Sequence, residues 1–241
     1  VDYSYLPDEI KCDFISLEIL FICLPVDLVL YFKNIFSKFN ILIDQTICAS
    51  YVKSINYKEN LHLTEHVSFI DVGFNKTSIV SYSKNKILSL EVLPVGGNNI
   101  TKDISNILEI DLEESEKLKT NFDQDNVISN NHSFSFDKLQ KIIFARTEEI
   151  LELSSNSGGS NLLKIGQSNM VLMGEGSKIL DNQYTNKISF AKDINFLEET
   201  TKDICQSGFN YVMKLNEHEV VVIPKKHTKQ RFFEKLFHFF K

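Results

Sequence analysis

The sequence predicts an α/β fold, because short apolar segments of strand type and longer amphipathic segments of helix type follow one another along the chain. The clearest strand is 67–72, a run rich in β-branched and aromatic residues that ends in a glycine turn. The clearest helix is 137–153, whose apolar residues recur at helical spacing. With 241 residues, 43% of them hydrophobic, the chain is long enough for one large domain or two small lobes.

The N-terminal part is predicted to alternate between strand and helix. Alternating side chains over 14–23 indicate a strand that Pro25 ends, and a helix is expected over about 26–39. A short strand at 41–44 and a helix at 46–55 complete a β-α-β-α order.

A second unit begins at residue 67. Its first strand leads through a glycine turn into a hairpin, with strands at 77–82 and 86–95, after which Gly96 and Gly97 break the sheet. The other elements expected are helices at 98–108, 112–119 and 137–153, a polar segment at 121–135, a Gly/Ser-rich link at 154–160, a short strand at 170–173 with a turn at 174–177, and a last helix at 196–215.

Residues 225–241 have the composition of an amphipathic helix that lies on a membrane surface. On a helical wheel the aromatic and leucine side chains fall within an arc of about 160°. The segment has six Lys or Arg and one Glu, a net charge of +5; because the whole chain carries −6, the residues before it carry −11. This pattern predicts attraction to anionic lipid. The residues expected to contact the membrane are Lys225, Lys226, Lys229, Arg231, Phe232, Phe233, Lys235, Leu236, Phe237, Phe239, Phe240 and Lys241.

The alternative for this tail is a terminal helix packed on the protein core. The preceding residues 217–229, with Pro224 and clustered charges, indicate a linker and favour the membrane interpretation. One such helix is a weak anchor, so the tail also predicts self-assembly or a multivalent partner. Because positive charge is concentrated at one end, a nucleic-acid partner is not expected.

Several short motifs occur in a characteristic order. A strand ends in Asp71-Val72-Gly73, a hairpin and a Gly-Gly-Asn break at 96–98 follow, and after helices a strand ends in Gly174-Glu175-Gly176-Ser177. This order resembles the second lobe of the actin and heat-shock-70 ATPases. Glycines at strand ends let backbone amides approach phosphate.

Three further matches make the resemblance specific to one family within this superfamily. They are the pair Glu116 and Lys119, the run Ala-Arg-x-Glu-Glu-Ile-Leu at 145–151, and the linker with its amphipathic C-terminal helix. Together these features resemble the FtsA family of bacterial cell-division actin homologues over essentially the whole chain. The resemblance implies an actin-like (ribonuclease H-like) ATPase fold, mainly the second lobe plus part of the first, with a C-terminal amphipathic helix. The family's first phosphate loop would precede Val1, which implies an N-terminally incomplete chain.

The resemblance also divides the chain into parts. They are the latter part of the division-specific small subdomain (1–45), a first-lobe segment (46–66), the second-lobe core (67–96 and 165–198), the second-lobe small subdomain (97–164), a closing helix (199–215), a linker (216–228) and the membrane-targeting helix (229–241).

The function implied is that of a cytoplasmic adaptor. It would polymerise beneath the inner membrane at the septum, attach the ring of the tubulin-like protein FtsZ to lipid, and recruit later division proteins. The small subdomain would contact FtsZ, with Arg146 as a candidate; a solvated charge or a partner of Glu149 is an equally open role for this side chain. Two other functions remain: an actin-like pilus-assembly scaffold, and an active ATPase of the actin and heat-shock-70 type.

The resemblance also implies a nucleotide site that binds ATP with Mg²⁺. Asp71 would contact the Mg²⁺ through a metal-bound water. The residues placed at this site are Asp71, Gly73, Lys76, Thr77, Gly96, Gly97, Asn98, Glu116, Lys119, Gly174, Gly176 and Ser177.

The phosphate loop departs from the family pattern. Where the family has Asp-Ile-Gly-Gly-Gly-Thr-Thr-Asp-Ile, this chain has two glycines fewer, with Phe74 in the loop and Ser78 in place of the second Asp. These changes predict a weak ATPase at most, and leave open that Asp71 and the glycines only shape strand-end turns. No catalytic residue and no metal-ligand motif is predicted.

Overall fold

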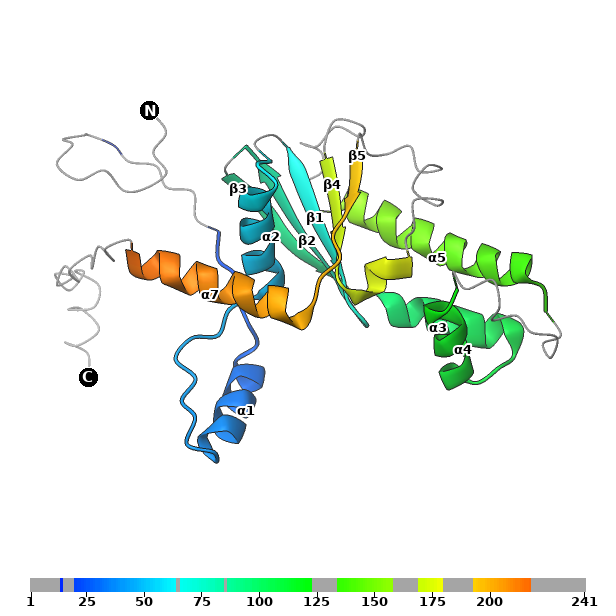
Figure 1. Ribbon diagram of the computed structural model, residues 1–241, viewed down its shortest axis with the longest axis horizontal. Coiled ribbons are helices and arrows are strands. Elements are labelled where there is room, and N and C mark those ends of the chain that lie inside the picture. The colour runs from blue at the N-terminus through cyan, green and yellow to red at the C-terminus, as the bar shows by residue number, and fades with distance from the viewer. Residues whose placement is uncertain are drawn as a thin grey trace, which may run out of the picture.

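A five-stranded mixed sheet forms the centre of the computed structural model (Figure 1). The structure describes residues 14, 20–63, 66–84, 86–122, 134–157, 169–179 and 193–217. The strands lie in the order β3-β2-β1-β4-β5. Their bounds are β1 (Val67–Val72), β2 (Thr77–Ser83), β3 (Lys86–Leu93), β4 (Asn169–Met173) and β5 (Asp193–Phe196).

Strand β1 is the middle of the sheet. It pairs antiparallel with β2, which pairs antiparallel with β3, and it pairs parallel with β4, which pairs parallel with β5. Alternate β1 side chains enter two separate cores: Val67 and Phe69 join one, and Ile70 and Val72 join the other. A strand buried on both faces is apolar at nearly every position, which explains why this segment stands out in the sequence.

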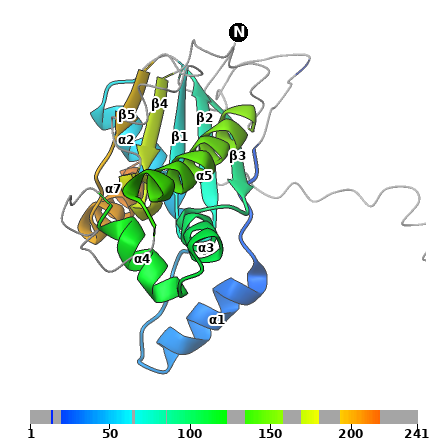
Figure 2. The same ribbon diagram turned by 90° about the vertical axis from the view of Figure 1, so that its right-hand side faces the viewer.

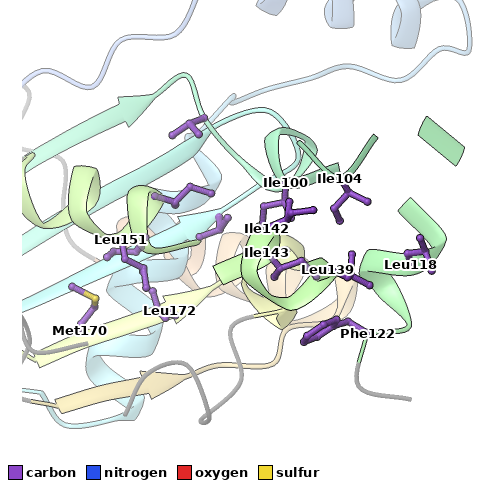
Figure 3. Packing of buried hydrophobic residues seen from close by; sticks show 14 of the residues in the cluster. Ile100, Ile104, Leu118, Phe122, Leu139, Ile142, Ile143, Leu151, Met170 and Leu172 are labelled. Atoms are coloured by element: carbon purple, nitrogen blue, oxygen red, sulfur yellow. The ribbon is translucent and has the colours of Figure 1, made fainter. Parts of the chain in front are cut away.

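Helix α5 (Phe136–Asn156) lies on one face of the sheet, α3 (Gly97–Leu108) packs against α5, and α4 (Leu112–Thr120) packs against α3. Figure 2 shows α5 crossing this face, with α3 and α4 beside its lower end. Ser135 caps the N-terminus of α5: its hydroxyl accepts a hydrogen bond from the amide of Lys138. The core between helices and sheet includes Ile100, Ile104, Leu118, Phe122, Leu139, Ile142, Ile143, Leu151, Met170 and Leu172 (Figure 3).

Helix α2 (Ala49–Asn60) lies on the other face, and α7 (Thr201–Glu217) packs against α2. Tyr57 of α2 joins Phe69 and Tyr82 in the core there. The two helices contact each other through an edge-on ring pair of Tyr51 and Tyr211, whose centroids lie 5.5 Å apart.

Helix α1 (Val26–Ser37) projects away from the sheet (Figures 1 and 2) and has no buried residue. None of the helices within the described ranges combines the length and apolar character needed to span a bilayer.

The expected α/β alternation is confirmed, as are the strands at 67–72 and 170–173, the hairpin, and the helices at 26–39, 98–108, 112–119 and 137–153. The polar segment at 121–135 and the link at 154–160 lie partly outside the described residues, and residues 154–156 belong to α5.

Two predicted strands are not formed where the structure describes them, and two predicted helices are present with shifted bounds. Of the strand predicted at 14–23, residues 15–19 lie outside the described part of the chain. Residues 20–24 and 41–44 are irregular, because alternation makes a strand only where a neighbour pairs with it; Leu42 is 91% exposed. The helix predicted at 46–55 runs instead from Ala49 to Asn60. The last helix starts at Thr201, and the segment before it is strand β5, since a short apolar run fits either structure until its neighbours are known.

Candidate functional site

Glycines bring three backbone segments together at the carboxyl ends of β1 and β4. The amide of Gly97, in the first turn of α3, donates to the carbonyl of Gly73, 2.9 Å away. A Cβ atom on Gly96 would lie 2.5 Å from that same carbonyl oxygen, and one on Gly176 would lie 2.7 Å from a methyl group of Val72. Only glycine permits these approaches, so the motifs are required by close backbone packing.

The turn after β4 lies against the carboxylate of Asp71. Gly174 has a φ of +89°, and a Cβ atom there would lie 2.5 Å from Asp71 Oδ1. The 3₁₀ turn η1 (Glu175–Ile179) follows directly. In open α/β sheets the crevice beyond the carboxyl ends of parallel strands is the usual ligand site, and this edge has that position.

Asp71 is held by two residues of α2. The hydroxyl of Ser50 donates to its Oδ2 at 2.7 Å, and the ammonium of Lys53 lies 2.9 Å from the same oxygen. Lys53 also donates to Glu199 Oε2 at 2.9 Å, and that oxygen accepts the amide of Gly174 at 3.0 Å. The Lys53 and Glu199 side chains are each 4% exposed, so this is a buried ion cluster.

The sequence did not predict Ser50, Lys53 or Glu199 as site residues. Ser50, Lys53 and Tyr57 are spaced three and four apart, which places them on one face of α2. That spacing is the only local signal, because Glu199 lies 146 residues beyond Lys53 in the chain.

Polar atoms without partners lie at the edge of this cluster. Neither Glu199 Oε1 nor the hydroxyl of Tyr57 makes a hydrogen bond to a described residue, although both are buried. Burial first, and then the neighbouring Glu199 carboxylate, raise the pKa of Tyr57 above its ordinary range. Tyr57 is therefore held in its neutral form.

Glu116 and Lys119 of α4 fold back onto the first turn of α3. Lys119 Nζ lies 2.6 Å from Glu116 Oε2, 2.8 Å from the hydroxyl of Thr101 and 3.2 Å from the carbonyl of Gly97. Burial raises the pKa of Glu116, but hydrogen bonds from Lys119 and Thr101 outweigh it and leave the pKa below its ordinary value. Glu116 is thus ionised, and its partner Lys119 lies against the glycine cluster.

The remaining predicted residues are mostly engaged within the protein. The buried hydroxyl of Thr77 donates to the carbonyl of Val95 at 2.8 Å, and the hydroxyl of Ser177 donates to the carbonyl of Gly174 at 2.7 Å. The amide of Asn98 donates to the carbonyl of Phe74 at 2.7 Å, and Lys76 is exposed in the same loop. The structure therefore gathers all twelve predicted residues at one edge of the sheet, but several of their polar groups already have protein partners.

These contacts do not fit a nucleotide-bound magnesium ion. Mg²⁺ takes oxygen ligands, typically one or two carboxylates plus waters and phosphates, whereas Asp71 already has the ammonium of Lys53 against one oxygen. The amides of Gly97 and Asn98, which a helix N-terminus would offer to phosphate, donate instead to the carbonyls of Gly73 and Phe74.

Arg146 is part of an ion pair between α3 and α5. Its Nε and one terminal nitrogen contact the two oxygens of Asp103 at 2.5 and 3.1 Å, and the other terminal nitrogen contacts Glu149 at 2.5 Å. The hydrogen bond to Asp103 raises the pKa of Arg146 further. The pairing with Glu149 is confirmed, and the pairing with Asp103 was not foreseen.

The predicted membrane-contacting residues, 225–241, lie outside the described residues.

Comparisons with known proteins agree with the fold and the motifs. Residues 68–171 match the family model of cell division protein FtsA. The FtsA of Bacillus subtilis (strain 168) is 36% identical in an alignment of 104 residues, and the match covers 37% of this chain and 24% of that protein. The resemblance to FtsA is thus confirmed for the central segment, and the match spans about a quarter of the curated relative's length.

Solved structures show the same architecture. The MreB5 of Spiroplasma citri bound to ADP superposes with a TM-score of 0.59 at 13% identity, covering 80% of this chain and 67% of that one. A chain of the PilM-PilN type IV pilus biogenesis complex gives a TM-score of 0.50 at 15% identity, covering 73% of this chain and 52% of that one. At such identities the likeness shows the fold alone, and it confirms the predicted actin-like ATPase fold.

Proposed function

We propose that this chain is a cell-division adaptor that polymerises as an actin homologue and attaches the FtsZ ring to the cytoplasmic face of the inner membrane. The observation that carries this proposal is the FtsA match over 68–171, which runs from β1 to β4 and includes α3, α4 and α5. The actin-like fold supports a polymer, and the basic, phenylalanine-rich sequence at 225–241 supports a lipid anchor.

The proposed mechanism is structural rather than catalytic. A weak amphipathic anchor holds a protein at a surface firmly only when several copies are linked, because linked copies raise one another's effective concentration there. Polymerisation would therefore strengthen membrane attachment and FtsZ recruitment together. The cluster around Lys53 and Asp71 supports a scaffold with at most weak ATPase activity, because an ammonium already neutralises the carboxylate that a metal would need.

The FtsZ-binding surface is proposed to lie on the small subdomain, 97–164. The α3–α5 edge supports this, since Asp103 and Glu149 fix Arg146 there while its side chain remains 26% exposed. A fixed, partly exposed guanidinium suits recognition of a carboxylate on a partner peptide.

Membrane binding is tested by sedimenting the protein with vesicles of phosphatidylethanolamine and phosphatidylglycerol. Deleting 225–241 is expected to abolish binding. Phe237→Ser is expected to weaken it about tenfold, because partial burial of one ring contributes roughly 1.5 kcal/mol. His238→Ser, a change on the polar side of the same predicted helix, is the matched control and should bind as the unmodified chain does.

Vesicle binding that survives the deletion would contradict the lipid-anchor part of the proposal. Membrane location that survives it only in cells would point to a partner-mediated association, as in a pilus-assembly scaffold.

FtsZ binding is tested by co-sedimentation with FtsZ polymers. Arg146→Glu is expected to reduce the bound fraction several-fold, whereas Lys141→Glu, an exposed change on the same helix, should not. Thermal unfolding of both variants checks that the fold is retained. Equal binding by the two variants would remove Arg146 from the proposed surface.

A further inference from the structure

Lys53 lies where four segments of the chain meet. Its ammonium is 2.9 Å from Asp71 at the end of β1 and 2.9 Å from Glu199, just before α7. Lys53 itself belongs to α2, and Glu199 in turn accepts the amide of Gly174 in the turn after β4. The buried Nζ of Lys53 thus links α2 to the end of β1 and to the segment before α7, and through Glu199 to the turn after β4.

The charges of this cluster require a cation. Two carboxylates that share a site repel each other, and an unpaired buried charge is strongly unfavourable. Asp71 and Glu199 are 15% and 4% exposed at the side chain, so water screens them little. Two carboxylates at such an edge would otherwise suit a hydrated divalent ion, and the ammonium supplies positive charge and three hydrogen-bond donors at that point.

We propose that the Lys53 ammonium is a built-in cation, which takes the place of a bound divalent metal and holds α2, β1 and the start of α7 in one arrangement without metal or nucleotide. Each carboxylate has a further donor within the protein: Ser50 for Asp71, and the amide of Gly174 for Glu199. The cluster is therefore held by the chain itself.

The backbone amides expected to face phosphate at this edge also have partners within the protein. Gly97 and Asn98 donate their amides to the carbonyls of Gly73 and Phe74, which joins the first turn of α3 to the loop after β1. A ligand changes such an arrangement only by binding a different one more tightly, and we expect neither metal nor nucleotide to do so at this edge. Any assembly of this chain would then be controlled by concentration and by partners. The inference does not depend on the adaptor function and would survive its failure.

The test is thermal unfolding of the full chain with MnCl₂, MgCl₂, or MgCl₂ with ATP. The unmodified protein is expected to unfold at the same midpoint under all conditions. Lys53→Ala should lower the midpoint by roughly 10 °C, because it leaves two buried carboxylates unpaired. Millimolar Mn²⁺ should restore most of that loss. Lys202→Ala, an exposed lysine at the start of α7, is the control and should leave the midpoint and its cation response unchanged.

A second variant separates cation binding from general stabilisation. Lys53→Ala combined with Asp71→Asn should no longer respond to Mn²⁺, since only one carboxylate remains. If Lys53→Ala does not fold alone, recovery of folded protein only when it is refolded with MnCl₂ is the supporting result.

Two results would overturn the proposal. One is a cation-dependent or Mg-ATP-dependent rise in the midpoint of the unmodified chain. The other is a Lys53→Ala protein whose stability or refolding does not respond to Mn²⁺.

Discussion

Nζ of Lys53 and Oε2 of Glu199 lie 2.9 Å apart although the two residues are 146 positions apart in the chain. Both side chains are almost fully buried, and Lys53 contacts Asp71 as well. This contact ties α2 to the segment before α7 at the edge of the sheet where the glycine motifs converge. It also places a cation between two buried carboxylates, which none of the motifs indicates.

Gly96→Ala is expected to destabilise the protein by about 1–3 kcal/mol. The new Cβ atom would lie 2.5 Å from the carbonyl oxygen of Gly73 and 2.8 Å from the amide nitrogen of Lys76, and backbone atoms cannot give way as a side chain can. Urea unfolding measures the loss. Gly208→Ala is the matched control: nothing lies within 4 Å of its Cβ position, so the free energy of unfolding should rise by up to about 1 kcal/mol. Equal effects at the two sites would refute the close packing.

The ion pair of Arg146 and Asp103 is expected to couple α3 to α5. A double-mutant cycle with Arg146→Ala and Asp103→Ala should give an interaction energy of about 0.5–1 kcal/mol, because the pair makes two contacts but remains about a quarter exposed. The pair of Lys117 and Glu113, with side chains 68% and 80% exposed, should give a smaller interaction energy, because water and salt screen exposed charges. Indistinguishable coupling energies would show that Arg146 contributes no more than a surface charge.

Glu116 is expected to make stability depend on pH in the acid range. Its pKa in the folded protein lies below the ordinary value of 4.5, so its contribution is present above that value and is lost as the pH falls through the folded pKa. The stability difference between the unmodified protein and Glu116→Gln should therefore be largest near neutrality and shrink below about pH 4. Chemical unfolding at several pH values measures it. Glu113→Gln, at an exposed position of the same helix, should show a smaller trend, and a difference that grows in acid would contradict the assignment.

Ile143→Ala is expected to cost about 2–5 kcal/mol in unfolding free energy. Its side chain is fully buried between α5 and the sheet, so the substitution leaves a cavity in the core (Figure 3). Leu153→Ala on the same helix, at a position 41% exposed, should cost well under half as much. Similar losses would mean that α5 packs on the sheet through a different face.

The sequence predicted the central elements well because their signals are local. A strand buried on both faces, such as β1, is apolar throughout, and a helix such as α5 repeats its apolar residues every three or four positions. The glycines predicted for the site do meet at one edge of the sheet, since close backbone approach tolerates no other residue, and their role in nucleotide binding stays a prediction. The errors fell on segments whose secondary structure depends on a neighbouring strand. Residues 41–44 were predicted as a strand but are irregular, and residues 193–196 form a strand that pairs with β4.

The sequence by itself determined the α/β class, the hairpin, the glycine-rich edge and the tail pattern, because each depends on residue type and spacing over a short stretch. Only the tertiary structure decided what occupies that edge. The partners of Asp71 and Arg146 come from other elements, Lys53 from α2 and Asp103 from α3, and pairing between side chains distant in sequence is set by packing rather than by any local pattern. The same packing decided that Asp71 pairs with Ser50 and Lys53, and that the amides of Gly97 and Asn98 donate to the carbonyls of Gly73 and Phe74.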